Sequence, residues 1–172
     1  MSRPAASPFD LVLLDRDGTI NVQVVGDYVR RPEDLVLLPG AAEAIALLNA
    51  VGCPVVVVTN QRGVARGLMS SADVDAVHER LGELLAEADA RVDAVLVCPH
   101  EAGTCRCRKP APGLLEEALR LVPGARRERC LLVGDSSTDI EAARALGVPG
   151  VLVGGTTGPT LLDVVRERLD VT

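Results

Sequence analysis

The segment from residue 11 to residue 21 constrains the fold of this chain most strongly. A run of four apolar residues, 11–14, is followed at once by Asp15, Arg16 and Asp17. A short apolar run that ends in polar and turn-forming residues is typical of a strand buried in a parallel sheet. Side chains two positions apart in an extended chain point to the same side. We therefore expect Asp15 and Asp17 to face one site and Arg16 to face away from it.

The two carboxylates would repel one another unless a cation or a shared proton lies between them. Gly18 follows directly and allows the backbone to turn tightly past a bound group. An alternative interpretation of Asp17 and Gly18 is a helix N-cap or a surface turn, where Asp-Gly is common. A turn leaves Asp15 at the end of an apolar run unexplained, so we favour a cation-dependent site.

Length and composition predict one compact domain over residues 1–172. The chain has 172 residues and is 48% hydrophobic, which suffices for one well-buried core. It is too short for two large domains. We find no apolar run of about 18 residues and no basic N-terminal segment ahead of an apolar one. The expectation is a soluble, cytoplasmic protein without a membrane partner.

Charge and aromatic content argue against a nucleic-acid partner. The formal net charge is −6, and Phe9 and Tyr28 are the only aromatic residues. An acidic protein is poorly suited to wrap a polyanion, and stacking platforms for bases need several aromatic side chains. A zinc-dependent nucleic-acid-binding module therefore fits this sequence badly.

Apolar segments of strand type and of helix type alternate along the chain. This alternation predicts a doubly wound, mostly parallel α/β sheet, with its site at the carboxyl ends of the strands. Helical spacing also places His78 within a helix, where we expect a solvated residue without a role. After the first strand at 11–14, the expected strands are 54–60, 92–97, 130–133 and 150–153, and the expected helices are 40–50, 70–85, 112–122 and 159–169.

Polar residues follow the later strands as well. Thr59 ends the second strand and Asp135 follows the fourth, with Asp139 at the start of the next helix. Lys109 is the single lysine of the chain, and its ammonium group is not interchangeable with an arginine guanidinium where a point charge is required. Asp139 is also explained as a favourable acid at a helix N-terminus.

A cluster of soft ligands occupies the loop 98–107. Cys98, His100, Cys105 and Cys107 lie within ten residues, and tetrahedral Zn²⁺ takes this number and type of ligand. Because a full Cys₃His shell leaves no position for water, the zinc would be structural. The alternative is a group of buried thiols beside a chance histidine. The remaining thiols of Cys53 and Cys130 are expected in the core, and an odd number of cysteines argues against a disulfide framework.

Four of these motifs resemble those of the haloacid dehalogenase superfamily of phosphatases. Asp15 to Asn21 is similar to its first motif, in the branch that contains histidinol-phosphate and heptose-bisphosphate phosphatases. The segment 59–67 resembles the second motif, Lys109 matches the third, and 134–139 resembles the fourth. The resemblance extends from Phe9 to about Val153 and implies a Rossmann-like core. Without a large insertion after the first motif, the chain is expected to be capless.

This resemblance implies a phosphatase mechanism through an aspartyl-phosphate. Asp15 would be the nucleophile and Asp17 the general acid and base, while Thr59 and Lys109 would stabilise the transferring phosphoryl group. Mg²⁺ would be held by Asp15, by the main-chain carbonyl of Asp17 and by Asp135, and Asp139 would support the site from the start of the next helix. The zinc loop would direct the residues that follow it, Arg108 and Lys109.

The resemblance also implies a small phosphorylated sugar as the substrate. We expect a monomer, since nothing in the sequence suggests an obligate partner. The expected reaction removes the 7-phosphate of D-glycero-D-manno-heptose 1,7-bisphosphate, and histidinol phosphate is the nearest competing substrate. A receiver-type signalling domain, which also combines acids, a threonine and a lysine, is the alternative from another class. The residues expected to contact the substrate are Gln23, Gly26, Asp27, Tyr28, Asn60, Gln61, Arg62 and Arg108.

Overall fold

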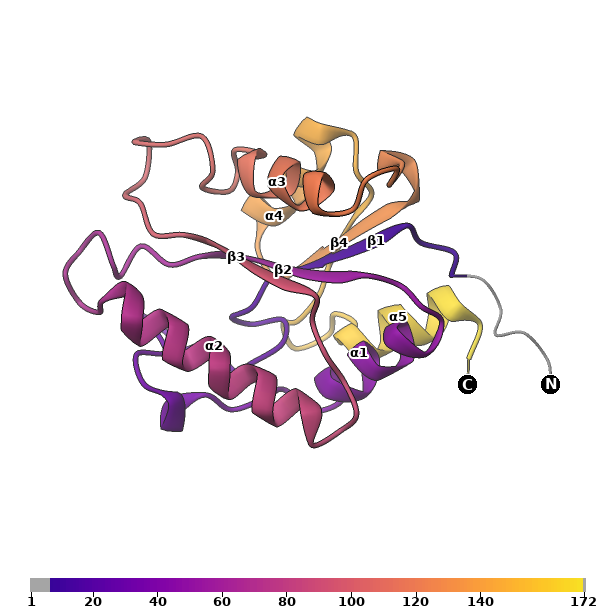
Figure 1. The fold of residues 1–172 in the computed structure, drawn as a ribbon, viewed down its shortest axis with the longest axis horizontal. Coiled ribbons are helices and arrows are strands. Elements are labelled where there is room, and N and C mark those ends of the chain that lie inside the picture. Colours follow the sequence, from indigo (N-terminus) through magenta and orange to yellow (C-terminus); the bar gives the residue numbers. More distant parts are fainter. Residues whose placement is uncertain (1–6, 172) are drawn as a thin grey trace.

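The computed structural model describes residues 7–171 and contains a five-stranded sheet with helices on both faces (Figure 1). The expected alternation of strands and helices is confirmed. The elements in chain order are β1 (Leu11–Leu14), a 3₁₀ turn (Pro32–Asp34), α1 (Ala41–Ala50), β2 (Val55–Asn60), α2 (Ser71–Ala86), β3 (Ala94–Cys98), α3 (Gly113–Leu121), a second 3₁₀ turn (Arg127–Arg129), β4 (Cys130–Gly134), α4 (Ser137–Leu146), β5 (Gly150–Leu152) and α5 (Leu161–Leu169).

The sheet has the strand order β3-β2-β1-β4-β5, and every neighbouring pair is parallel. The strand that the sequence singled out, β1, therefore lies at the centre. The chain runs from β1 outward to β2 and β3, and then crosses to β4 on the other side of β1. Ligands of doubly wound sheets bind at such a reversal, outside the carboxyl ends of the strands.

Helices α1, α2 and α5 cover one face of the sheet, and α3 and α4 cover the other (Figure 1). Alternate residues of β1 enter different cores: Val12 and Leu14 face the first group of helices, and Leu11 and Leu13 face the second. All four side chains are fully buried. A strand buried on both faces needs an unbroken apolar run, which explains the pattern in the sequence.

Side-chain caps begin α2, α4 and α5. Ser70 caps α2 in a reciprocal pair with Asp73. Ser136 caps α4 in the same way with Asp139. A cap satisfies main-chain N–H groups that have no partner within the helix. The α4 cap also places Asp139 directly beside the end of β4.

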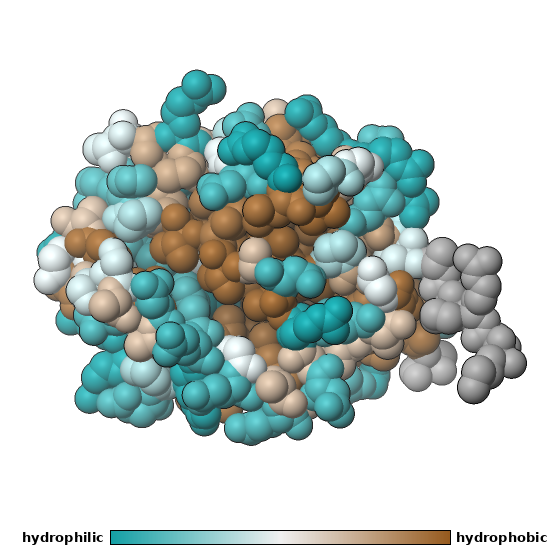
Figure 2. Space-filling view, viewed as in Figure 1, coloured by the Kyte–Doolittle hydropathy of each residue, from teal (hydrophilic) through white to brown (hydrophobic). Residues whose placement is uncertain are grey.

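Strand β3 forms an edge of the sheet and is only half-buried along most of its length. Figure 2 shows apolar side chains gathered in the middle of the face on which this edge lies. Within residues 7–171, no helix is both long and apolar enough to cross a membrane. Cys53 and Cys130 are buried and unpaired, as expected for thiols in the core.

Candidate active site

A cavity of about 220 Å³ lies at the carboxyl ends of β1, β2 and β4. It collects the four residues expected to be catalytic, the expected magnesium ligand of β4 and most of the expected substrate contacts. Residues from four separate motifs thus share one cavity, because parallel strands end at the same edge of the sheet. The expected residues that line it are Asp15, Asp17, Gln23, Asp27, Tyr28, Thr59, Asn60, Arg108, Lys109 and Asp135.

Lys109 is the cation at the centre of this cavity. Its Nζ lies 2.7 Å from Asp15 Oδ1 and 2.5 Å from Asp139 Oδ1, and it donates a 2.7 Å hydrogen bond to the main-chain carbonyl of Val58. Burial opposes the charge, but Asp15 and Asp139 raise the pKa of Lys109 above its usual value. The buried amine is therefore an ammonium group held between two acids.

Three carboxylates surround this single ammonium group. Oxygen atoms of Asp15, Asp135 and Asp139 lie within 4.8 Å of one another. Burial is the main cause of the raised pKa of Asp15 and of Asp135, and repulsion from Asp139 adds to both. One lysine does not neutralise three acids, and clustered carboxylate oxygens are the ligands that Mg²⁺ prefers. The donor set therefore fits a divalent cation.

The acid cluster differs in one respect from the magnesium ligands that the sequence suggested. Asp15 and Asp135 belong to the acid cluster as expected, whereas Asp17 was expected to contribute only its main-chain carbonyl. The carboxylate that joins the cluster is Asp139, which is almost completely buried. Asp139 was expected to support the site from the start of α4 without binding the metal, and the packing of α4 against β4 places its carboxylate in the cavity.

Gly18 is required by the approach of the β1 loop to Asp135. Its φ of +83° is in the left-handed region, and a Cβ at this position would overlap Asp135 Oδ2. A side chain here would therefore both strain the backbone and displace an acid of the cluster.

We expect Gly18→Ala to reduce kcat/KM by about 10- to 100-fold, as for other changes that displace a metal ligand. The matched control is Gly52→Ala, because Gly52 has φ of +72° and no atom within 4 Å of the position of a Cβ. Thermal unfolding should show similar losses of stability for both variants, with activity lost only in Gly18→Ala. Equal activities of the two variants would contradict this role of Gly18.

The carboxylate of Asp17 is held by three neighbouring side chains. Arg16 Nη2 donates to both carboxylate oxygens at 2.9 Å, Asn21 donates at 2.9 Å and Gln61 at 2.8 Å. Burial opposes ionisation, yet Arg16 and the two amides lower the pKa of Asp17 below its usual value. Arg16 does not line the cavity, as expected, but its long side chain contacts the neighbouring Asp17 carboxylate, which alternation did not predict.

The expectation that His78 is solvated was wrong. Instead of a solvated residue on α2, His78 is half-buried, and its Nε2 lies 2.9 Å from Arg16 Nη1. Burial, together with the charge of Arg16, lowers the pKa of His78 to about 4, although Asp17 opposes this shift. The neutral ring can accept a hydrogen bond from Arg16. Helical periodicity could not reveal this contact, which joins residues 62 positions apart.

The expected substrate residues of β2 have different surroundings. Asn60 lines the cavity, and its amide also holds the main chain of Lys109 through two hydrogen bonds of 3.1 Å. Gln61 is fully buried and bonded to Asp17 and to the Thr59 hydroxyl, and so it does not face the cavity. Arg62 forms a 3.0 Å ion pair with Glu101 of the zinc loop and does not line the cavity either.

The loop after β1 supplies one wall of the cavity. Gln23, Asp27 and Tyr28 line it, whereas Gly26 lies in the turn outside it. The ring of Tyr28 packs so closely against Gly63 that a Cβ there would touch it at 3.0 Å. Further lining residues that the sequence analysis did not single out as contacts are Val24, Val29, Ser136 and Thr138.

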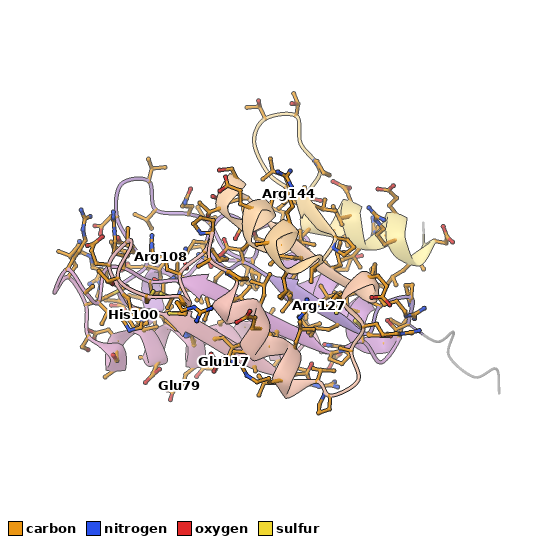
Figure 3. All side chains as sticks on the ribbon, turned by 90° about the horizontal axis from the view of Figure 1, so that it is seen from above. Glu79, His100, Arg108, Glu117, Arg127 and Arg144 are labelled. Atoms are coloured by element: carbon orange, nitrogen blue, oxygen red, sulfur yellow. The ribbon has the colours of Figure 1, made fainter. Side chains whose placement is uncertain are left out.

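The expected zinc ligands come together beside this cavity. Cys107 Sγ lies 3.2 Å from both Cys98 Sγ and His100 Nδ1, and all four ligand atoms lie within 4.8 Å of one another. Burial opposes ionisation of Cys105. Hydrogen bonds from the Arg108 N–H and from the neighbouring thiols nevertheless lower the pKa of Cys105, which favours a thiolate. These residues could hold one Zn²⁺ ion. Figure 3 labels His100 and Arg108 at the same end of the molecule.

A parallel sheet whose central strand ends in Asp-x-Asp, above a cavity with a buried lysine and further acids, is the arrangement of haloacid dehalogenase-like hydrolases. Comparison with family models agrees with this class: a HAD-hydrolase-like model matches residues 106–170.

Similar proteins cover most of the chain. A D-glycero-α-D-manno-heptose-1,7-bisphosphate 7-phosphatase of Mycobacterium bovis is 44% identical over 92% of this chain and 86% of its own length. A D-glycero-β-D-manno-heptose-1,7-bisphosphate 7-phosphatase of Pseudomonas aeruginosa is 42% identical over 83% of this chain and 80% of its own. The crystal structure of D,D-heptose 1,7-bisphosphate phosphatase from B. bronchiseptica, complexed with magnesium and phosphate, superposes with a TM-score of 0.84, at 34% identity, over 93% of this chain and 98% of that one. The chain therefore belongs to the phosphatases of the haloacid dehalogenase-like family.

Proposed function

We propose that this phosphatase removes the 7-phosphate of D-glycero-D-manno-heptose 1,7-bisphosphate, a step towards nucleotide-activated heptose. The observation that carries the proposal is the single cavity in which Lys109 contacts Asp15 and Asp139, with Asp135 beside them. The names of the similar proteins support this sugar over histidinol phosphate. They also argue against a receiver-type signalling domain, because the similar proteins are phosphatases.

In the proposed reaction, an oxygen of Asp15 attacks the phosphorus atom and forms an aspartyl-phosphate. The bond between phosphorus and the sugar oxygen breaks, and Asp17 donates a proton to that oxygen. Asp17 then accepts a proton from a water molecule that attacks the phosphorus. The bond to Asp15 breaks, and inorganic phosphate leaves.

The charges around Asp15 suit this chemistry. Lys109 and the Thr59 hydroxyl would stabilise the phosphoryl oxygens, and Lys109 favours the ionised, nucleophilic form of Asp15 against the opposing effect of burial. The carboxylates of Asp15 and Asp135 and the main-chain carbonyl of Asp17 would hold Mg²⁺, with Asp139 beside them. When bound, this cation supplies the positive charge that allows an anionic carboxylate to approach an anionic phosphate.

The sugar would occupy the outer part of the cavity. We propose that Gln23, Asp27, Tyr28, Asn60 and Arg108 contact it, since all of them line the cavity. Gly26, Gln61 and Arg62 would act on the substrate indirectly, through the turn, through Asp17 and through the zinc loop, respectively.

The remaining parts of the proposal concern the organisation of the chain. Residues 1–172 would form a single, capless, monomeric phosphatase domain, in which zinc in the loop 98–107 is structural. Asn60 joins this loop to the site, because it bonds to the main chain of Lys109. A rigid loop would thus present Arg108 and Lys109 to the phosphate.

A panel of substrates tests the proposed function. With Mg²⁺ present, we expect many turnovers per enzyme and a kcat/KM for heptose bisphosphate at least about 10³-fold above that for histidinol phosphate, because recognition of substrate hydroxyls can discriminate by more than this. The α- and β-anomers should be measured separately, since the similar proteins act on one or the other by name. A higher kcat/KM for histidinol phosphate would overturn the proposed sugar. A single stoichiometric phosphorylation without turnover would overturn the proposal that the protein is an enzyme.

A further inference from the structure

Arg16 lies between Asp15 and Asp17, directly after β1, and is completely buried. Its side chain is among the largest fully buried ones in residues 7–171. A buried guanidinium group is costly unless its donors are paired. Nη2 and Nε of Arg16 donate to Asp17, which leaves Nη1 on the opposite side of the group.

His78 pairs with this remaining nitrogen. The residue lies in α2, far from the strand ends in sequence, and its Nε2 is 2.9 Å from Arg16 Nη1. Because burial keeps the ring neutral near pH 7, Nε2 can be the acceptor when the proton is on Nδ1. The helix is thereby joined to Asp17 by a chain of two hydrogen-bonded contacts.

We propose that His78 is a positioning residue for the general acid: by accepting a hydrogen bond from Arg16, it fixes the guanidinium group that orients the Asp17 carboxylate towards the leaving oxygen. This inference rests on the role proposed above for Asp17. His78 does not line the cavity and so acts only through Arg16. Nothing in the mechanism otherwise requires a histidine on α2.

The structure sets the size of the expected effect. Asn21 and Gln61 also hold Asp17, at 2.9 and 2.8 Å, so that loss of His78 loosens the carboxylate without releasing it. Lys109 bonds to Asp15, Asp139 and the Val58 carbonyl, and His78 bonds to Arg16, so the nucleophile and the acid cluster should be unaffected. The defect should therefore be confined to protonation of the leaving group.

The test compares leaving groups that need an acid with one that does not. An alkyl phosphate needs protonation of its leaving oxygen, whereas p-nitrophenyl phosphate releases a stable phenolate. For His78→Leu, which removes the acceptor, we expect kcat/KM for heptose bisphosphate to fall by about 10-fold or more, the scale of changes to supporting contacts. The kcat/KM of His78→Leu for p-nitrophenyl phosphate should stay within about 2-fold of the wild-type value, because its leaving group needs no proton.

Two further variants separate this role from a structural one. His78→Gln retains an acceptor at the end of its side chain and should restore most of the kcat/KM for the sugar phosphate. Glu79→Leu changes the exposed neighbour on the same helix and should leave both substrates unaffected.

Three results would overturn the inference. They are equal losses for both substrates in His78→Leu, no loss for either, and a His78→Gln variant as impaired as His78→Leu. In all three, activity of the wild type on heptose bisphosphate leaves the proposed function standing. A wild-type enzyme that hydrolyses neither substrate with Mg²⁺ present would overturn the proposed function and the inference together.

Discussion

Asp15→Asn is expected to lower kcat for heptose bisphosphate by about 10⁴-fold or more, the scale seen when an enzyme loses its nucleophile. An amide oxygen is a poor nucleophile towards phosphorus, and the variant cannot form the aspartyl-phosphate. The fold should persist, because asparagine retains an acceptor for the 2.7 Å contact from Lys109. Burial already disfavours the charge of Asp15, so that a neutral side chain is tolerated there.

The matched control for this variant is Asp10→Asn at the opposite end of the same strand. Asp10 precedes β1 and pairs with Arg126 and Arg129, far from the cavity. It should retain near-normal turnover. Steady-state kinetics and thermal unfolding should be measured for both variants, with mass spectrometry of acid-quenched wild-type enzyme for a phosphorylated Asp15. A kcat of Asp15→Asn within about 10-fold of the wild type would remove Asp15 from the role of nucleophile.

Loss of zinc is the second change with a large expected effect. Cys107→Ser should remove the ion and lower kcat/KM by about 10- to 100-fold, because metal binding supplies the folding energy of such a loop and supports the residues beside it. Arg108 and Lys109 follow Cys107 directly, and Asn60 joins the main chain of Lys109 to β2. The loop 98–107 should also become more susceptible to proteolysis.

Zinc analysis and ordered addition of metals separate this effect from loss of magnesium. Wild type and Cys53→Ala, which changes a buried thiol outside the cluster, should each bind one zinc per chain, and Cys107→Ser none. After treatment with a chelator, Mg²⁺ alone should leave kcat/KM low, and Zn²⁺ added afterwards should restore it. Full recovery with Mg²⁺ alone, or wild type purified without zinc, would show that the cluster does not hold a zinc needed by the site.

Much of the fold and several members of the site could be predicted from the sequence because they depend on local patterns. The apolar run at 11–14 indicated a strand buried on both faces, and β1 lies at the centre of the sheet. The cysteine and histidine spacing indicated a ligand cluster, and these atoms meet in space. Parallel topology then brings separate strand ends to one edge, so that Asp15 and Asp135 could be expected together.

Other contacts could not be predicted, because they depend on the reach of long side chains. Alternation along the chain placed Asp15 and Asp17 at one cavity and Arg16 outside it, yet it could not show that Arg16 reaches Asp17. The spacing of α2 described His78 as solvated, whereas the packing of that helix places it against Arg16. Gln61, expected at the substrate, is instead buried beneath Asp17.

The sequence by itself determined the order of the elements, the burial of β1 and the chemical types gathered at the strand ends, because periodicity and residue type act locally along the chain. Only the tertiary structure decided which acid faces Lys109 and what holds Asp17. Asp139 joins the cluster because α4 packs beside β4, and His78 reaches Arg16 because α2 covers one face of the sheet. Both contacts depend on distances between elements remote in the chain, which no local pattern encodes.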